Sequence, residues 1–157
     1  MIQIDGRVLL SLNVKHFPEN YGPYLFCHKN IANLTYRGNG EIDGQGWTWW
    51  FKFTFDKDPS RPRLVRWYDI DGGEFTGIKL KNSPNSHMKL TNSRNIWLHD
   101  FEIEVDAWGK LLGVNLPWFG FNTDGIDADA VNMLVERLNI TCHDDAVVIK
   151  RGDYQCS

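Results

Sequence analysis

The sequence has no excess of positive charge and no long apolar run. Its 157 residues carry 17 Lys and Arg against 20 Asp and Glu, and this net charge of −3 excludes the overall basic surface typical of nucleic-acid-binding proteins. No stretch is long and apolar enough to cross a membrane. We therefore expect neither a nucleic acid nor a membrane as partner.

Cysteine is scarce, and its spacing does not favour a metal site. Cys27, Cys142 and Cys156 form neither a CxxC pair nor a zinc-type arrangement. These three cysteines could form one disulfide, which would leave one free thiol. We therefore expect no metal and no other cofactor.

A secretory leader is also missing. The N-terminal segment MIQIDGRVLLSLN lacks a basic stretch followed by a long apolar run and a small-residue cleavage site. The chain could therefore begin inside a longer gene product. Localisation has to be inferred from other features of the sequence.

No segment has the pattern of an amphipathic helix of ordinary length, whereas short β-type runs recur between Gly, Asn and Asp. Four runs resemble one another, each an apolar strand followed by a polar corner; they start at Asn30, Glu74, Asn95 and Val131. Their alignment makes Ile78, Phe101 and Leu138 equivalent, 23 and 37 residues apart. A period in the low twenties favours a solenoid, a stack of rungs, over a β-sandwich with shorter, regular spacing.

Two segments interrupt this pattern, and both are expected to be loops. The segment from Gln45 to Arg66 contains the aromatic residues Trp47, Trp49, Trp50, Phe51, Phe53 and Phe55. We expect it to cap or flank the rungs. The segment from Ala107 to Pro117 precedes the acidic motifs, and loops on a rigid solenoid commonly carry substrate contacts.

Candidate catalytic residues lie in two acidic motifs, Asn122-Thr123-Asp124 and Asp144-Asp145. Asp124 precedes Asp144 by 20 residues, about one rung, which predicts that the two motifs lie on neighbouring rungs roughly 4.8 Å apart. Adjacent side chains of a strand point to opposite faces, so Asp144 and Asp145 must lie at a bend to share a cleft.

Three carboxyl groups this close cannot all ionise at their ordinary pKa, so at least one is expected to keep its proton to higher pH. One protonated carboxyl and one carboxylate are what glycoside hydrolysis requires. The alternative interpretation is that Asn, Asp and Gly gather here only because they suit β-turns. The whole constellation favours the catalytic interpretation.

At these motifs the sequence resembles glycoside hydrolase family 28, the polygalacturonase family. The resemblance extends upstream through Gly38 to Trp50, Arg61 to Trp67 and Leu80 to Leu90. It implies an all-β, right-handed parallel β-helix that hydrolyses α-1,4-galacturonic linkages of pectin with inversion and without a metal. It also implies an extracellular protein acting on polygalacturonate or pectin oligosaccharides.

The resemblance also implies residue roles. Asp144 would be the general acid, Asp124 and Asp145 would hold the attacking water, and Asn122 would frame the cleft. His143 and Lys150 complete the candidate substrate-binding residues. Related rhamnogalacturonan hydrolases tend to have Glu in the second acidic motif, so Asp145 favours a polygalacturonic substrate.

The sequence departs from the family pattern near its C-terminal end. His143 stands where a Gly commonly precedes the Asp pair, and Ala146 stands where a Cys commonly follows it. The later Gly-His-Gly and Arg-Ile-Lys motifs do not follow before Ser157. We therefore expect residues 1–157 to be a partial β-helix domain that lacks later rungs, is weakly active or inactive alone, and is marginally stable or self-associating.

Two further functions stay open from the sequence. One is a non-catalytic β-helical carbohydrate-binding module that kept the acidic corner. The other is a calcium-dependent pectate lyase, because clustered Asp residues can also coordinate a hard cation. Binding without turnover that Asp144→Asn leaves unaffected would favour the first. An unsaturated product with chelator sensitivity would identify the second.

Overall fold

The computed structural model describes residues 1–13, 16–17, 24–55, 61–106, 108–111, 114–117 and 120–150. Its strands are β1 (Ile2–Gln3), β2 (Arg7–Leu9), β3 (Tyr24–Arg37), β4 (Glu41–Asp43), β5 (Arg63–Thr76), β6 (Lys79–Lys81), β7 (Met88–Glu104), β8 (Trp108–Leu111), β9 (Val114–Pro117), β10 (Ile126–Thr141) and β11 (Val147–Ile149), and its helix is α1 (Gly46–Phe55).

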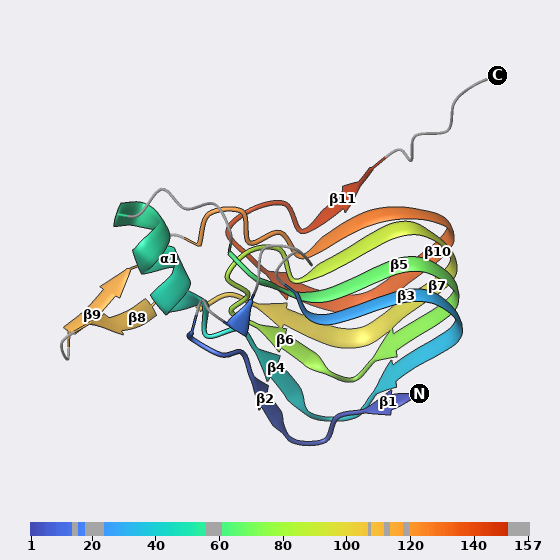
Figure 1. Ribbon diagram of the computed structural model, residues 1–157, viewed down its shortest axis with the longest axis horizontal. Helices are drawn as coiled ribbons and strands as arrows, with labels where there is room; N and C mark the ends of the chain where they lie inside the picture. The colour runs from blue at the N-terminus through green and yellow to red at the C-terminus, as the bar shows by residue number, and fades with distance from the viewer. Residues whose placement is uncertain are drawn as a thin grey trace.

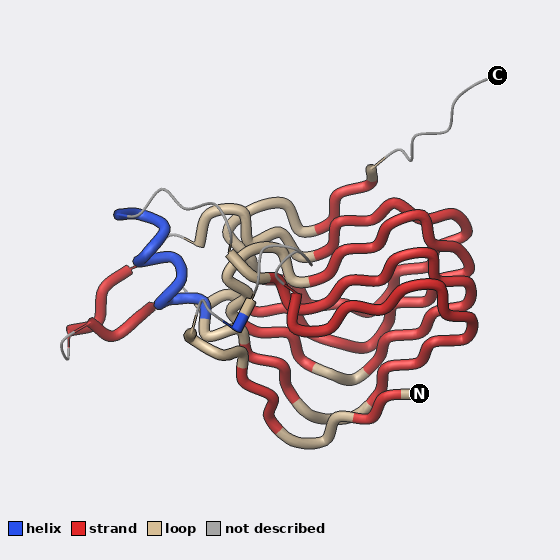
Figure 2. Tube along the Cα trace, in the orientation of Figure 1, coloured by secondary structure: helices blue, strands red, loops and turns tan. Residues whose placement is uncertain are grey.

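Parallel strands stacked in rungs form the body of the molecule (Figures 1 and 2). β3, β5, β7 and β10 pair in parallel, each with the next, and β4, β6 and the end of β7 form a second parallel series. The predicted right-handed parallel β-helix is confirmed, and the β-sandwich alternative is wrong. Within the described residues, no helix is long and apolar enough to cross a membrane.

The predicted equivalence of residues in successive rungs is confirmed. Phe101 lies beside Leu138 in the register of β7 and β10. The pairing of Leu80 with Ile103, two residues further on, places Ile78 beside Phe101. The period read from the sequence therefore corresponds to one turn of the solenoid.

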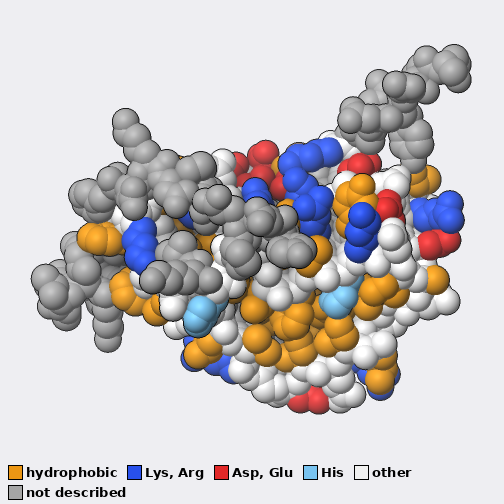
Figure 3. All heavy atoms as spheres, viewed as in Figure 1, with side chains coloured by type: hydrophobic (Ala, Val, Ile, Leu, Met, Phe, Trp, Pro, Cys, Tyr) orange, Lys and Arg blue, Asp and Glu red, His pale blue; other side chains and the backbone are white. Residues whose placement is uncertain are grey.

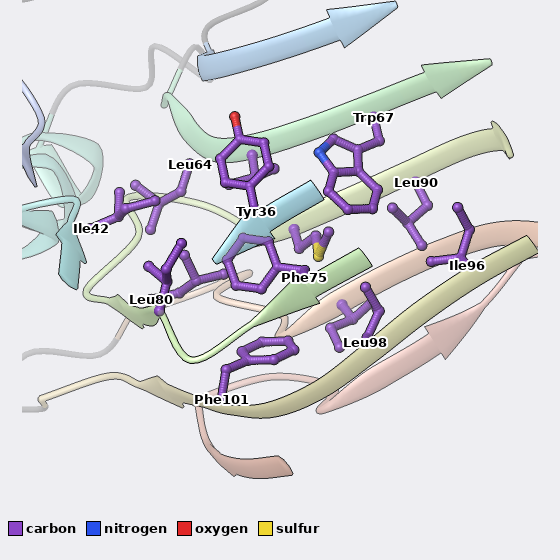
Figure 4. Close-up of a cluster of buried hydrophobic side chains, with 14 of the residues drawn as sticks. Tyr36, Ile42, Leu64, Trp67, Phe75, Leu80, Leu90, Ile96, Leu98 and Phe101 are labelled. Atoms are coloured by element: carbon purple, nitrogen blue, oxygen red, sulfur yellow. The ribbon is translucent and has the colours of Figure 1, made fainter. Parts of the chain in front are cut away.

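Inward side chains stack into continuous columns. The register aligns Val8, Ile42, Leu80, Ile103 and Ile140. The three middle members are 0% exposed, while Val8 and Ile140 are only partly buried. Figure 4 shows a second part of the core, where Tyr36, Phe75 and Phe101 lie close together. Stacking thus buries the core most completely in the middle rungs.

The corners between strand segments require left-handed backbone. One corner column consists of Gly38, Gly77, Asp100 and Arg137, and all four have positive φ. Another aligns Asn33, Gly72, Asn95 and Asn132, again all with positive φ, and the Asn132 amide donates to Asn95 Oδ1 at 2.7 Å. Gly and Asn tolerate this conformation, which explains their recurrence between the apolar runs.

The segment around α1 differs from the prediction. We expected a loop from Gln45 to Arg66 and no helix, but residues 46–55 form α1 and residues 63–66 belong to β5. Residues 56–60 lie outside the described part of the chain. Trp49 and Trp50 are buried on it, and Phe53 follows at helical spacing. Aromatic residues have modest helix propensity, so packing of this face rather than local preference favours the helix.

The second interruption is also more ordered than predicted. β8 and β9 pair antiparallel, with Trp108 opposite Pro117 and Leu111 opposite Val114. Ala107, Leu112 and Gly113, all within the predicted loop, lie outside the described residues. Both α1 and this hairpin lie to one side of the stacked rungs (Figure 1). Cys27 and Cys142 are free cysteines, and Cys156 lies outside the described residues.

Replacing Gly77 with Ala should destabilise the fold by roughly 2 kcal/mol or more, because a Cβ would lie 2.2 Å from the Gly38 carbonyl oxygen at a φ of +75°. Gly6→Ala is the matched control, since a Cβ at Gly6 meets nothing within 4 Å. Urea unfolding of both variants measures the difference. Equal unfolding midpoints would contradict the role of this corner.

Candidate active site

The two acidic motifs meet at the beginning of β10 and β11. Ile126 pairs with Val147 in the parallel register, and the Gly125 amide donates to the Asp145 carbonyl oxygen at 2.9 Å. Asp124 and Asp145 are therefore neighbours on adjacent rungs, about 4.8 Å apart along the stack. The prediction that the motifs lie on neighbouring rungs is confirmed.

Asp144 and Asp145 lie at a bend, as their adjacency required. Residues 143, 144 and 146 form bends immediately before β11, and both Asp side chains are exposed. The Asp144 carboxylate accepts hydrogen bonds from the backbone amides of Asn122 at 3.2 Å and Asp145 at 2.9 Å. These bonds orient it and connect the second motif to the first.

The Asp124 carboxyl is half-buried, and its pKa is raised. Burial is the largest cause, and the like charges of Asp127 and Asp144 raise it further. A hydrogen bond from its own backbone amide and the charge of Lys150 oppose this shift. The sequence predicted an elevated pKa from crowding alone, whereas desolvation contributes more.

A hollow of about 350 Å³ opens beside Asp124. Its lining residues are Phe53, Arg61, Arg63, Asn85, Asn122, Asp124, Asp127 and Lys150. Three of the predicted site residues, Asn122, Asp124 and Lys150, are thus brought together here. Asp144 and Asp145 lie on the adjoining bend outside this lining, as does the exposed His143.

His143 and Lys150 contact the site in different ways. The His143 backbone amide donates to Thr123 Oγ1 at 3.2 Å, while its side chain is exposed. His143 stands where the family commonly has Gly, but it is not among the described non-glycine residues with positive φ, so its backbone does not require Gly. Lys150 Nζ forms an ion pair with the buried carboxylate of Asp127 at 2.7 Å.

Arg61 places a buried positive charge in the wall of the hollow. Its side chain donates to the carbonyl oxygens of Pro84 and Phe121 and, at 3.3 Å, to Asn122 Oδ1. The guanidinium lies 4.2 Å from the Phe53 ring centre, which connects it to α1. Burial lowers the pKa of Arg61 to about 10, so the group stays charged at neutral pH.

Four more cations, Arg63, Arg66, Lys89 and Lys150, form what we call the cation row. Burial lowers the pKa of Lys89, and repulsion from the other three lowers it further. Within the described part of the chain, Arg63, Arg66 and Lys89 form no ion pair with a carboxylate. Figure 3 shows Lys and Arg side chains gathered beside acidic ones on one face. The row is suited to an anionic ligand.

The sequence did not identify Arg61, Arg63 or Asp127 as site residues, although Arg61 and Arg63 lie in a segment that carries the family resemblance. The structure reveals Arg63, because extending the register by two residues aligns it with Ser86, Asp124 and Asp145 in one column. The hydrogen bond from Arg63 Nε to Ser86 Oγ, 3.2 Å long, agrees with this alignment. The members of this column are unequally spaced along the chain, so a search for a fixed repeat does not find them.

A larger hollow, of about 540 Å³, lies at a different corner of the rungs. Its polar side chains bond to one another: Asn92 donates to Asp69, and Arg94 pairs with Asp71 at 2.8 Å. None of the predicted catalytic residues lines it. The smaller hollow beside Asp124 is therefore the candidate active site.

Curated relatives with assigned activities match most of this chain. Endopolygalacturonase I of Aspergillus niger is 25% identical over 138 residues, covering 87% of this chain and 35% of that protein. A polygalacturonase of Cryptomeria japonica is 30% identical over 160 residues, covering 96% of this chain and 28% of that protein. The chain thus spans about a third of the length of such relatives.

Solved structures agree on the fold. An endo-xylogalacturonan hydrolase from Aspergillus tubingensis superposes with a TM-score of 0.80 at 22% identity, over 93% of this chain and 38% of that one. An exopolygalacturonase from Thermotoga maritima gives 0.72 at 22% identity, over 96% and 42%. The family described as glycosyl hydrolases family 28 matches residues 1–157, and the chain therefore belongs to it.

Proposed function

We propose that this chain carries the acidic centre of a polygalacturonase-type hydrolase that cleaves α-1,4-galacturonic linkages of pectin with inversion. The observation that supports this most is the meeting of the two acidic motifs on adjacent rungs, beside the cation row. Relatives named as polygalacturonases agree with it. Pectin is a cell-wall polymer, so we place the protein outside the cell.

In this mechanism Asp144 is the general acid, and it donates its proton to the leaving glycosidic oxygen. Asp124 and Asp145 hold a water molecule, which attacks the anomeric carbon from the opposite face and gives up a proton to a carboxylate. The carbon–oxygen bond breaks as the new one forms, so the configuration inverts. Asn122 frames the cleft.

The raised pKa of Asp124 suits a base. A carboxylate whose pKa lies nearer the working pH is a stronger proton acceptor, provided that it is still ionised. Activity should therefore fall as the pH drops through this raised pKa. The acidic limb of the pH profile then lies above the ordinary pKa of an Asp carboxyl.

The positive charges of the cation row complement the negative charge of the proposed substrate. Each galacturonate unit carries a carboxylate, and Arg and Lys side chains bind carboxylates through charge-assisted hydrogen bonds. Arg63 and Lys150 line the hollow itself, while Arg66 and Lys89 extend the positive field away from it. His143, exposed next to the acidic pair, completes the proposed substrate contacts.

The other two functions have less support. A non-catalytic binding module would use the cation row in the same way, and turnover separates it from a hydrolase. For a calcium-dependent lyase, the described residues contain no group of three or more His, Cys, Asp or Glu side chains arranged to hold a metal ion. No observation favours the lyase.

Asp144→Asn should lower the release of reducing ends from polygalacturonate by ~10²- to 10⁴-fold, because an amide cannot donate the proton of a general acid. Asp5→Asn is the matched control, since Asp5 is an exposed carboxylate in the first rung. Activity of the Asp144 variant equal to that of the parent would rule out Asp144 as the general acid. Oligogalacturonate binding without turnover, with an affinity that Asp144→Asn leaves unchanged, would instead favour a binding module.

Asp127→Asn should lower the pKa of Asp124, because it removes a neighbouring negative charge and leaves Lys150 unpaired. Lys150→Met should raise the same pKa, because it removes the opposing positive charge. Titration of the Asp124 carboxyl by ¹³C NMR measures both shifts, and the acidic limb of the activity profile should follow. Shifts of the same sign in the two variants would contradict this electrostatic account.

Arg66→Gln and Lys89→Gln should each weaken binding of trigalacturonate two- to fivefold, which corresponds to about 0.5–1 kcal/mol. Added salt should reduce the difference, because Arg66 and Lys89 are only partly buried and ions still screen their charges. Arg37→Gln is the control, an exposed cation outside the hollow and the cation row. Calorimetric titration gives the affinities, and an equal loss in all three variants would show only an effect of net charge.

A further inference from the structure

His87 is a buried histidine that the proposed mechanism does not use. It directly precedes β7, it is 0% exposed, and it does not line the hollow beside Asp124. Both of its ring nitrogens have hydrogen-bond partners on backbone atoms. Its side chain therefore joins two turns of the chain beneath the candidate active site.

These partners determine which ring nitrogen carries the proton. The Ser83 backbone amide, which can only donate, lies 3.2 Å from His87 Nε2. Nε2 must therefore be unprotonated, and the proton of the neutral ring lies on Nδ1. Nδ1 then donates to the backbone carbonyl oxygen of Asp124 at 3.0 Å. Burial lowers the pKa of His87 to about 4, which agrees with a neutral ring.

The same Asp124 carbonyl accepts a second bond, from the His87 backbone amide at 2.9 Å. The backbone bond belongs to the parallel ladder, but the ring bond is an addition that only a side chain with a donor at this position provides. At the other end of this turn, Arg61 binds the Phe121 carbonyl, and Thr123 Oγ1 donates to Gly120 O at 2.7 Å. Buried donors thus hold both the start of the turn and the Asp124 carbonyl at its end.

We propose that His87, neutral and protonated on Nδ1, is a positioning residue that fixes the backbone of Asp124 and hence the direction of its carboxyl group. Its consequence for turnover rests on the proposed function of Asp124, whereas its effect on the Asp124 carboxyl does not. A displacement of a reacting group by about 1 Å can cost ~10²-fold in rate. His87 acts only through Asp124 and does not touch the substrate.

The test compares His87→Asn with His87→Gln. An Asn amide nitrogen occupies nearly the position of Nδ1, so this variant keeps a donor for Asp124 O. A Gln amide reaches the position of Nε2 and accepts from the Ser83 amide, but it has no donor near Nδ1. Both variants should be less stable in urea. If their losses of stability are similar, a difference between them in kcat or in the Asp124 titration cannot come from destabilisation alone.

The expected results differ between the variants. In His87→Gln, the Asp124 carboxyl should titrate closer to an ordinary Asp in ¹³C NMR, because the freed turn exposes it to water. The kcat of His87→Gln should fall ~10- to 100-fold with little change in KM. His87→Asn should keep the parent's titration and most of its kcat. Unchanged titration in a folded His87→Gln, or equal changes in both variants, would overturn the proposal.

A measurement on the unaltered chain keeps the proposal testable if the variants fail to fold. The ¹⁵N shifts of the His87 ring should show a protonated Nδ1 and an unprotonated Nε2, and the reverse assignment would overturn the inference. Failure of the proposed function can be distinguished from failure of this proposal. If Asp144→Asn keeps full turnover while the two His87 variants still differ in Asp124 titration, the catalytic assignment is wrong and the positioning role stands.

Discussion

Hydrogen bonding between parallel strands in successive rungs is the constraint on which the site depends. Each rung lies about 4.8 Å from the next, and the ladder allows little sliding because inward side chains stack in columns. The register of β5, β7, β10 and β11 places Arg63, Ser86, Asp124 and Asp145 in one line. Residues far apart in sequence therefore form one surface.

The charges at this surface are arranged in two parts. Asp124 is half-buried among carboxylates, and Arg61 lies buried in the same wall. The cation row lies beside them and is short of carboxylate partners among the described residues. Carboxyl groups in unlike surroundings separate into proton donors and acceptors, while neighbouring cations attract an anionic chain. The arrangement supports the proposed hydrolysis of a polyuronate.

Side-chain hydrogen bonds tie down the backbone beneath the acids. His87 and Arg61 reach the turn of Asp124 from preceding segments, and Thr123 is itself fully buried. Such bonds cost little in a rigid solenoid, because the partners are already ordered by the ladder. A catalytic group on a turn gains the precision that a loop alone would lack.

The sequence by itself determined the repeating strands, the Gly and Asn corners and the two acidic motifs, because period and turn chemistry are local properties. It did not reveal α1, whose aromatic residues favour a helix only when Trp49 and Trp50 are buried. Nor did it reveal the column from Arg63 to Asp145, whose members are 23, 38 and 21 residues apart. Insertions between rungs change these distances without changing the stacking. Only the tertiary structure, by setting register and burial, decided which cations face Asp124 and why its pKa is raised.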